Sequence, residues 1–262
     1  MKLPIYIVDA FAQTSFSGNP AAICPLDKWI DDDVMQKIAE ENNLSETAFF
    51  VPVGDKIEIR WFTPNAEVDL CGHATLATAY VVFNQLQFKG ESIHFFSPRS
   101  GDLKVTKSGE QFFLNFPSDT ISPLPMDEKF HTCFAYQPSY VYQGKTDLMF
   151  VFENEDQIHN IGPNFIEISK LGGRGVIVTA KGKEVDFVSR CFYPQVGVNE
   201  DPVTGSAHTT MIPYWSKTLN KVHLSAKQIS KRGGHLTCEY QGERVVIGGE
   251  GKLYLVGTIE IA

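Results

Sequence analysis

An internal repeat is the feature of this sequence that most constrains its fold. The first copy begins at Phe62 with Phe-Thr-Pro and reaches Cys71-Gly-His-Ala after a short polar segment. The second begins at Phe192 with Phe-Tyr-Pro and reaches Thr204-Gly-Ser-Ala. Each copy joins an extended segment to a tight turn with glycine and then to an apolar stretch of helical length. A long unit that occurs twice predicts two similar half-molecules.

The two copies can be aligned residue by residue. Phe62 is matched with Phe192 and Val68 with Val198, after which a three-residue insertion brings Cys71 onto Thr204. The insertion also places different polar residues at the matched position, His73 in the first copy and Ser206 in the second. Farther upstream, a matched count places Gly173 opposite Glu46.

Each repeat predicts one buried helix surrounded by short strands. The helix from Gly72 to about Leu86 is apolar nearly all the way round, which is typical of a helix enclosed by other elements. The second helix is expected from Thr204 to about Leu219, with a kink or an early end at Pro213. Near the C-terminus, the glycines of 248–251 predict a turn between two strands.

The expected fold is therefore α+β. It has two pseudo-symmetric domains, each a β-barrel-like sheet wrapped around a central helix. We predict domains at 1–117 and 118–262, with the last strand free to cross to the first domain. The proline-containing stretch after Phe116 is interpreted as the linker.

Composition excludes several classes of partner. Apolar residues make up 43% of the chain and charged residues 21%, as in soluble globular proteins. With 23 basic and 31 acidic residues the formal charge is −8, and no Lys/Arg cluster stands out, which argues against nucleic acid and membrane partners. The five cysteines contain no Cys-x-x-Cys motif, which favours reduced thiols and a cytoplasmic location.

Motifs for cofactors and metals are absent from the sequence. There is no G-x-G-x-x-G after a strand and no G-x-x-x-x-G-K-[ST], so nucleotide-binding folds are poorly supported. The segment that begins at Thr204 does not match G-x-S-x-G, and the seven histidines show no metal-ligand spacing. We therefore expect neither a cofactor nor a metal.

The two helix starts are candidate binding sites. Gly72 and Gly205 leave backbone N–H groups open to close approach, and a helix N-terminus binds carboxylate or phosphate. If the halves are related by a pseudo-two-fold axis, both starts can face one cleft. The alternative is that each glycine serves only its turn.

Four polar side chains near these helix starts each have two interpretations. His73 suits a proton carrier, with a pKa that the helix N-terminus would lower, or it caps a turn. Glu46 leads into an apolar strand, where burial would raise its pKa towards an acid/base range, or it is a solvated strand-edge residue. Asp201 holds a substrate amine or hydroxyl, or it caps the helix, and Ser206 binds substrate or is a first-turn hydroxyl.

Four motifs together resemble those of the PhzF family, the phenazine-biosynthesis-type isomerases that share the fold of diaminopimelate epimerase. The resemblance covers essentially the whole chain. It implies two similar domains with the active site between them, a homodimer, and catalysis without a cofactor. The motifs are Ser17-Gly-Asn-Pro-Ala-Ala-Ile, Asn43-Leu-Ser-Glu-Thr-Ala-Phe, Phe62-Thr-Pro with Cys71-Gly-His-Ala-Thr, and Gly197-Val-Asn-Glu-Asp-Pro-Val-Thr-Gly-Ser-Ala.

The resemblance also assigns roles to residues of this chain. Glu46 matches the family's acid/base glutamate and would move a proton on a small carboxylated substrate. His73 and Asp201 would hold or relay protons at the amine and hydroxyl. The remaining positions would bind substrate, with its carboxylate at the two helix starts: Gly72, Gly205, Ser206, Asn19, Cys71 and Thr204.

Two other functions remain open at this point. The related epimerase uses two cysteines, but here Cys71 is matched with Thr204, whose hydroxyl is far too weak an acid to replace a thiol. This disfavours a two-thiol racemase and leaves open an epimerase that uses Glu46 with another group. Entry of solvent deuterium at the α-carbon of an amino acid would identify such an enzyme. A non-enzymatic metabolite-binding scaffold is the third possibility, although it would not need all four polar residues.

Overall fold

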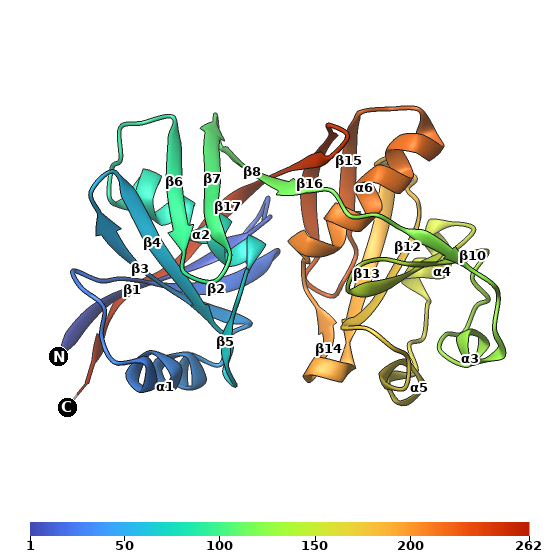
Figure 1. Cartoon of the computed structure of the whole chain (residues 1–262), viewed down its shortest axis with the longest axis horizontal. Helices are drawn as coiled ribbons and strands as arrows, with labels where there is room; N and C mark the ends of the chain where they lie inside the picture. Colours follow the sequence, from blue (N-terminus) through green and yellow to red (C-terminus); the bar gives the residue numbers. More distant parts are fainter. Residues whose placement is uncertain (262) are drawn as a thin grey trace. The chain divides into compact units, whose positions relative to one another are not determined.

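The structure is a computed structural model that describes residues 1–261, and its contacts divide the chain into two units. The first unit contains Met1–Asn115 and the chain from Gly248 onward, and the second contains Phe116–Ile247 (Figure 1). The chain thus passes into the second unit close to residue 117, and its last strand returns to the first. No helix among the described residues is both long and apolar enough to cross a membrane.

The first unit is a closed barrel of strands. Each strand pairs with the next in the order given below, and the last pairs again with the first. The order is β1 (Lys2–Ala10), β2 (Asn19–Pro25), β3 (Glu46–Val53), β4 (Lys56–Phe62), β6 (Ser92–Ser97), β7 (Gly101–Ser108), β8 (Gln111–Pro117) and β17 (Arg244–Glu260).

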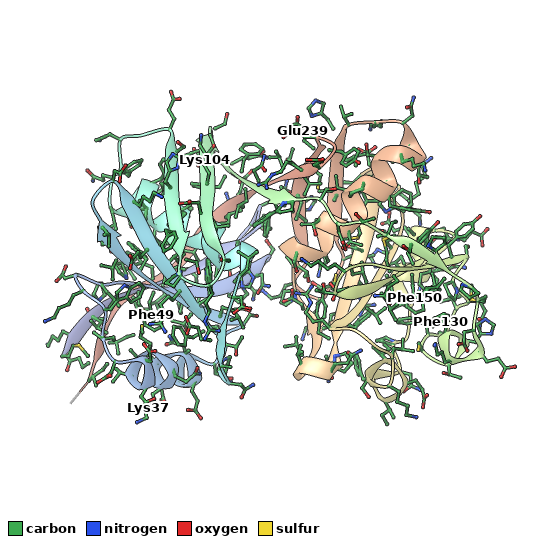
Figure 2. The ribbon with its side chains drawn as sticks, viewed as in Figure 1. Lys37, Phe49, Lys104, Phe130, Phe150 and Glu239 are labelled. Atoms are coloured by element: carbon green, nitrogen blue, oxygen red, sulfur yellow. The ribbon has the colours of Figure 1, made fainter. Side chains whose placement is uncertain are left out.

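The helix α2 (Gly72–Tyr80) is the buried helix that the sequence predicts. Every residue from 73 to 79 is buried, and the helix packs against β1, β2 and β3. Its two threonines fit this apolar position because each hydroxyl donates to a carbonyl one turn earlier, Thr75 to Cys71 O and Thr78 to Ala74 O. The helix continues as a π-helical turn over Val81–Gln85. On the other side of the sheet, α1 (Asp32–Asn42) packs its apolar face on Phe49 (Figure 2).

The second unit has the same plan around α6 (Gly205–Leu219). Pro213 lies inside this helix without ending it. The unit also contains three short helices, α3 (Glu128–His131), α4 (Glu155–His159) and α5 (Phe165–Ser169). The ring of Phe130, in α3, packs on the ring of Phe150 with their centroids 5.3 Å apart (Figure 2). The strand order is β9 (Ser122–Leu124), β10 (Tyr140–Gln143), β11 (Asp147–Val151), β12 (Gly175–Lys181), β13 (Phe187–Tyr193), β15 (His223–Gln228), β16 (Gly234–Tyr240) and the start of β17. The predicted linker therefore contains a strand, β9.

The strand pairings confirm the internal repeat. In the first unit β2 is parallel to β3, β3 antiparallel to β4, and β4 parallel to β6. In the second unit the same relations join β11, β12, β13 and β15. In each unit a short strand pairs antiparallel with the second strand of the central hairpin. This strand is β5 (Glu67–Val68) beside β4 in the first unit and β14 (Val198–Asp201) beside β13 in the second.

The register of these strands corrects two details of the predicted alignment. Thr47 pairs with Phe62 and Val176 with Phe192, so the residue equivalent to Glu46 is Gly175 and not Gly173. The two loops before these strands differ in conformation, which a count along the sequence cannot detect. In the same way, Val68 corresponds to Asp201 rather than Val198, because the insertion lies upstream in the turn Pro194–Val196.

A third correction concerns the glycines near the C-terminus. The predicted turn at 248–251 does not form, because these residues lie inside the continuous strand β17. A Cβ at Gly248 would meet the ring of Phe113 at 2.5 Å, and one at Gly249 would meet Phe11 at the same distance. The glycines therefore let aromatic rings pack directly on the strand backbone.

Candidate active site

The first unit holds a compact polar cluster at the start of α2. Glu46 is the first residue of β3, and Cys71 and His73 flank the first residue of α2, Gly72. Glu46 Oε2 lies 3.0 Å from His73 Nε2, and Cys71 Sγ lies 3.4 Å from His73 Nδ1. His73 and Cys71 are each only 6% exposed. Strand β3 and helix α2 therefore bring a half-buried carboxylate together with a buried imidazole and a buried thiol.

Asn19 completes this cluster from the first motif. Its Nδ2 lies 3.4 Å from His73 Nδ1, and its Oδ1 accepts a hydrogen bond of 3.2 Å from Ser45 Oγ. The turn before it requires glycine, because Gly18 has φ of +73° and a Cβ there would lie 2.3 Å from Ala10 O. This turn holds Asn19 against His73.

The prediction that His73 has a lowered pKa is wrong. Burial alone would lower the pKa of His73, but its contacts with Cys71 and Glu46 outweigh burial and raise it well above its ordinary value. Burial and the Glu46 charge raise the pKa of Cys71, which keeps the thiol protonated at neutral pH. The Glu46 carboxylate is therefore the charge that stabilises protonated His73. The pair holds a proton beside a carboxylate at the start of α2.

Glu46, Cys71 and His73 also have the donor types of a metal site. Their ligand atoms lie within 4.8 Å of one another. However, His73 presents Nε2 to Glu46 and Nδ1 to Cys71, at different positions on the ring. One ion bound to one ring nitrogen would have to replace one of these contacts. The geometry suits a proton path through the imidazole better than a shared metal.

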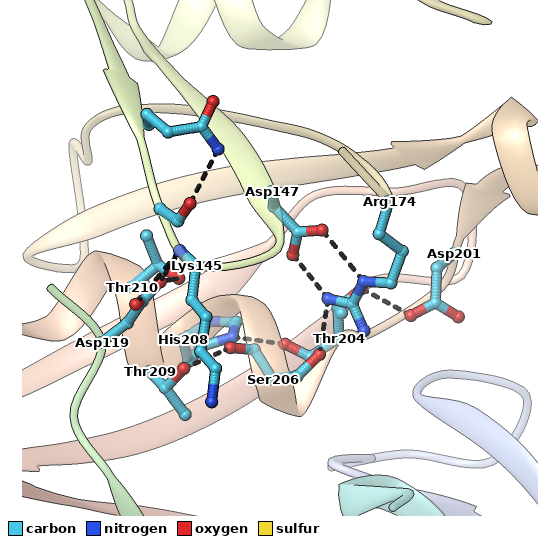
Figure 3. A network of polar contacts seen from close by, with 12 residues as sticks. Asp119, Lys145, Asp147, Arg174, Asp201, Thr204, Ser206, His208, Thr209 and Thr210 are labelled. Carbon is cyan, nitrogen blue, oxygen red and sulfur yellow. Dashed lines mark hydrogen bonds and ion pairs between the residues drawn. The ribbon is translucent and has the colours of Figure 1, made fainter. Parts of the chain in front are cut away.

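A second polar cluster lies at the start of α6 in the second unit (Figure 3). Thr204, the residue before the helix, donates its hydroxyl to Asp201 Oδ2. The buried Gln228 supports both residues, because its Oε1 accepts from Thr204 N at 2.9 Å and its Nε2 donates to Asp201 O at 2.8 Å. The N-cap residue of α6 is therefore Thr204 and not Asp201. Asp201 lies three residues before Thr204 and accepts its hydroxyl hydrogen bond.

Ser206 contacts Arg174, and Arg174 is held in turn by Asp147. The sequence predicted neither residue as part of the site. Arg174 Nη2 donates to Ser206 Oγ at 3.0 Å, and Arg174 Nε donates to Asp147 Oδ1 at 2.9 Å (Figure 3). Asp147 is only 1% exposed, and the guanidinium also lies over the Tyr193 ring at 4.9 Å. The available signal in the sequence was an arginine just before a buried strand, β12.

The charge state of this second cluster follows from its contacts. Burial alone would lower the pKa of Arg174, but its hydrogen bonds to Asp147 outweigh burial and keep the guanidinium charged. Because Ser206 Oγ accepts from Arg174, the serine hydroxyl can direct its own proton elsewhere. Ser206 is therefore prepared to act as a hydrogen-bond donor.

Both helix starts lack side-chain caps among the described residues. Neither the Cys71 nor the Thr204 side chain accepts a hydrogen bond from the first turn of its helix. Uncapped N–H groups at the positive end of a helix dipole suit an anion such as a carboxylate.

The structure thus places the predicted residues in two groups. The first unit contains Asn19, Glu46, Cys71, Gly72 and His73, and the second contains Asp201, Thr204, Gly205 and Ser206. In the first group Asn19, Cys71 and Glu46 each contact His73. In the second group Thr204 contacts Asp201, and Ser206 contacts Arg174.

The chain is similar to several known proteins. A family model described as phenazine biosynthesis-like protein matches residues 8–257. A Pseudomonas aeruginosa protein named as an uncharacterized isomerase is 48% identical over 261 residues, covering 100% of both chains. A PhzF-family crystal structure from Enterococcus faecalis is 50% identical, with a TM-score of 0.97 over 100% of both chains. A predicted epimerase of Pseudomonas aeruginosa, 18% identical with a TM-score of 0.76 over 99% of this chain and 100% of that one, shares the fold. The chain belongs to the phenazine biosynthesis-like (PhzF) family.

Proposed function

We propose that this isomerase moves a proton on a small carboxylated substrate, with Glu46 as the acid/base group and no cofactor. The observation that carries the proposal is the pair of half-buried Glu46 and buried His73, 3.0 Å apart at an uncapped helix start. A carboxylate held against a protonated imidazole can accept a proton from carbon and return it at another carbon. The names of similar proteins, which include isomerases at 46–48% identity, support the same reaction class.

The internal repeat supports a special role for Glu46. Its equivalent in the second unit is Gly175, where a Cβ would lie 2.5 Å from Phe192 O and 2.1 Å from the Tyr193 ring. That position therefore has no room for any side chain. Because the two units have otherwise kept the same strand pairings, a carboxylate in one copy alone is explained by chemistry rather than by packing.

The other residues would bind and orient the substrate. Gly72, Gly205 and Ser206 offer N–H and O–H donors for its carboxylate, and His73 and Asp201 would hold or relay protons at its amine or hydroxyl. Asn19, Cys71 and Thr204 would fix His73 and Asp201 in place while contacting the substrate. In this account Arg174 is a positioning residue, because it touches Ser206 and directs its hydroxyl proton.

An amino-acid racemase or epimerase is the second candidate, and one observation favours it. The Cys71 thiol lies 3.4 Å from His73 and is protonated at neutral pH, so it could supply a proton to an α-carbon. Its counterpart Thr204 cannot act as the second acid/base group, which leaves Glu46 for that role.

A screen in D₂O tests the proposal. Carboxylated metabolites, including free amino acids and unsaturated amino or hydroxy acids, are incubated with the enzyme and analysed by mass spectrometry. The proposed reaction places solvent deuterium at an allylic carbon of the rearranged product, and the racemase reaction places it at the α-carbon of an amino acid. Conversion of a substrate without any solvent deuterium would contradict proton transfer through an exchangeable side chain. In Cys71→Ser, the isomerase activity should persist and the racemase activity should be lost.

A further inference from the structure

A second concave site lies in the second unit and involves none of the residues discussed so far as catalytic. It has a volume of about 480 Å³, within the range of small-molecule sites. Its walls come from the end of α4, the strands β13, β14 and β15, and the 229–233 loop between β15 and β16. The side chain of Ile229, 9% exposed, is its apolar element.

The charge of this pocket is opposite to the charge of the chain. The chain has a formal charge of −8, yet four cationic side chains line the pocket: Arg190, Lys227, Lys231 and Arg232. The sequence alone does not predict this pocket, because only the fold brings Arg190 of β13 next to the other three cations. The only carboxylate of the lining is that of Glu200, and Arg190 binds both of its oxygens, at 2.7 and 2.9 Å.

Two of the lining cations, Lys227 and Lys231, are not neutralised by a carboxylate of the described residues. Neither Lys227 nor Lys231 forms an ion pair with any residue from 1 to 261. Like charges in one concavity repel each other unless a counter-ion binds. The Lys227 charge also acts on His235, its partner residue in the pairing of β15 with β16. Burial is the larger cause that lowers the pKa of His235, and the Lys227 charge is the next.

The 229–233 loop, which carries Lys231 and Arg232, is fixed in place, and Lys227 lies in the strand β15 before it. Ile229 N donates to Ser189 O at 2.8 Å, which ties the loop to β13. Ser230 Oγ donates to Pro202 O at 2.7 Å and accepts from Gly233 N at 3.2 Å. Gly233 closes the turn with φ of +69°, a conformation that favours glycine. Preorganisation of this kind lowers the entropy cost of binding a ligand.

We propose that this pocket binds a phosphorylated small molecule with at least two negative charges. Lysine ammonium groups are point charges that suit phosphate oxygens, and Arg190 already uses two of its N–H donors on Glu200. The volume leaves room beyond the phosphate for an organic body against Ile229. A purely solvated basic surface would need neither the cavity nor the tethered loop.

NMR titration of the intact protein at constant ionic strength tests this proposal, with inorganic phosphate, pyrophosphate and citrate as probes. We expect pyrophosphate to shift the amide signals of 229–233 saturably and to bind more tightly than citrate. In Lys227→Gln/Lys231→Gln, the pyrophosphate Kd should rise at least about tenfold, the loss expected for two charged contacts. The matched control is Lys181→Gln/Lys217→Gln, two exposed lysines of the same unit without ion pairs among residues 1–261, whose Kd should equal that of the wild type.

Three outcomes would overturn the proposal. They are shifts that do not saturate, equal Kd values in the pocket variant and the wild type, and tighter binding of citrate than of pyrophosphate. Unchanged amide signals elsewhere in the second unit establish that the double variant is folded, and Lys227→Arg/Lys231→Arg should retain binding. Because the readout is binding and not turnover, its result does not depend on the proposed isomerase activity.

Discussion

At the residue scale, the contact between Glu46 and His73 is the central feature of the first cluster. Glu46 lies 3.0 Å from the buried imidazole, and its carboxylate and Cys71 together raise the pKa of His73 against the effect of burial. The protonation of His73 is therefore expected to depend on this carboxylate.

The variant Glu46→Gln tests this dependence. Removing the carboxylate should lower the pKa of His73 below its wild-type value, because burial would then oppose the charged imidazole with only Cys71 beside it. The measurement is an NMR titration of the His73 ring protons. The ring-proton signals of the exposed His223 serve as the internal control. An unchanged His73 pKa would show that Glu46 is not the stabilising charge.

A second residue-scale prediction concerns His208, which is fully buried in α6. Its Nδ1 donates to Thr204 O at 2.8 Å, and burial lowers its pKa to about 4. The unfolded chain takes up a proton near pH 6.5, so this contribution to stability is complete above pH 6.5 and is lost as the pH falls towards 4. The loss should reach about 3 kcal/mol, since each pKa unit corresponds to about 1.4 kcal/mol.

Urea unfolding of the wild type and His208→Asn at several pH values checks this prediction. Asparagine keeps a donor for Thr204 O and cannot be protonated, so the difference in unfolding free energy between the two proteins should change between pH 6.5 and pH 4. Comparing the two proteins also removes the contribution of His73, which has the opposite sign because its folded pKa is raised. A difference that does not vary with pH would contradict the assignment.

At the scale of elements, the sequence identified the repeated helix starts correctly but not all the side chains that support them. The apolar run after Gly72 and the matched run after Gly205 predicted α2 and α6 because periodicity and glycine are local signals. The contact of Arg174 with Ser206 could not be predicted, since it depends on how β12 and α6 pack. Strand register likewise corrected the partner of Glu46 to Gly175, because loop conformations are not readable from residue counts.

The ion pair of Arg174 and Asp147 predicts a large effect on stability. In Arg174→Ala, Asp147 would stay buried without its partner, and the unfolding free energy should fall by about 3 kcal/mol. This loss lies at the low end of the losses measured when a buried ion pair is broken, because the Arg174 side chain is 38% exposed. The double variant Arg174→Gln/Asp147→Asn should recover much of the loss, since no charge is left buried. Equal destabilisation in both variants, measured by urea unfolding, would contradict this account.

At the scale of the whole molecule, two units with the same strand pairings carry different polar groups. The duplicated fold, the central helices and the family were predictable from the sequence, because four motifs and one long repeat lie along the entire chain. The basic pocket could not be predicted from the sequence, because its cations come from separate elements of the fold. The division of roles between the units, with a carboxylate at Glu46 and no side chain at Gly175, became clear only from the register.

The most direct test of the central claim is the rate at which Glu46→Gln introduces solvent deuterium into a substrate that the wild type labels in D₂O. Glutamine keeps the size of the side chain and cannot transfer a proton, so we predict a rate at least about 100-fold lower in a folded protein. Glu46→Asp, which keeps an acid, should retain part of the activity. Labelling by Glu46→Gln at the wild-type rate would contradict the assignment of Glu46 as the acid/base group.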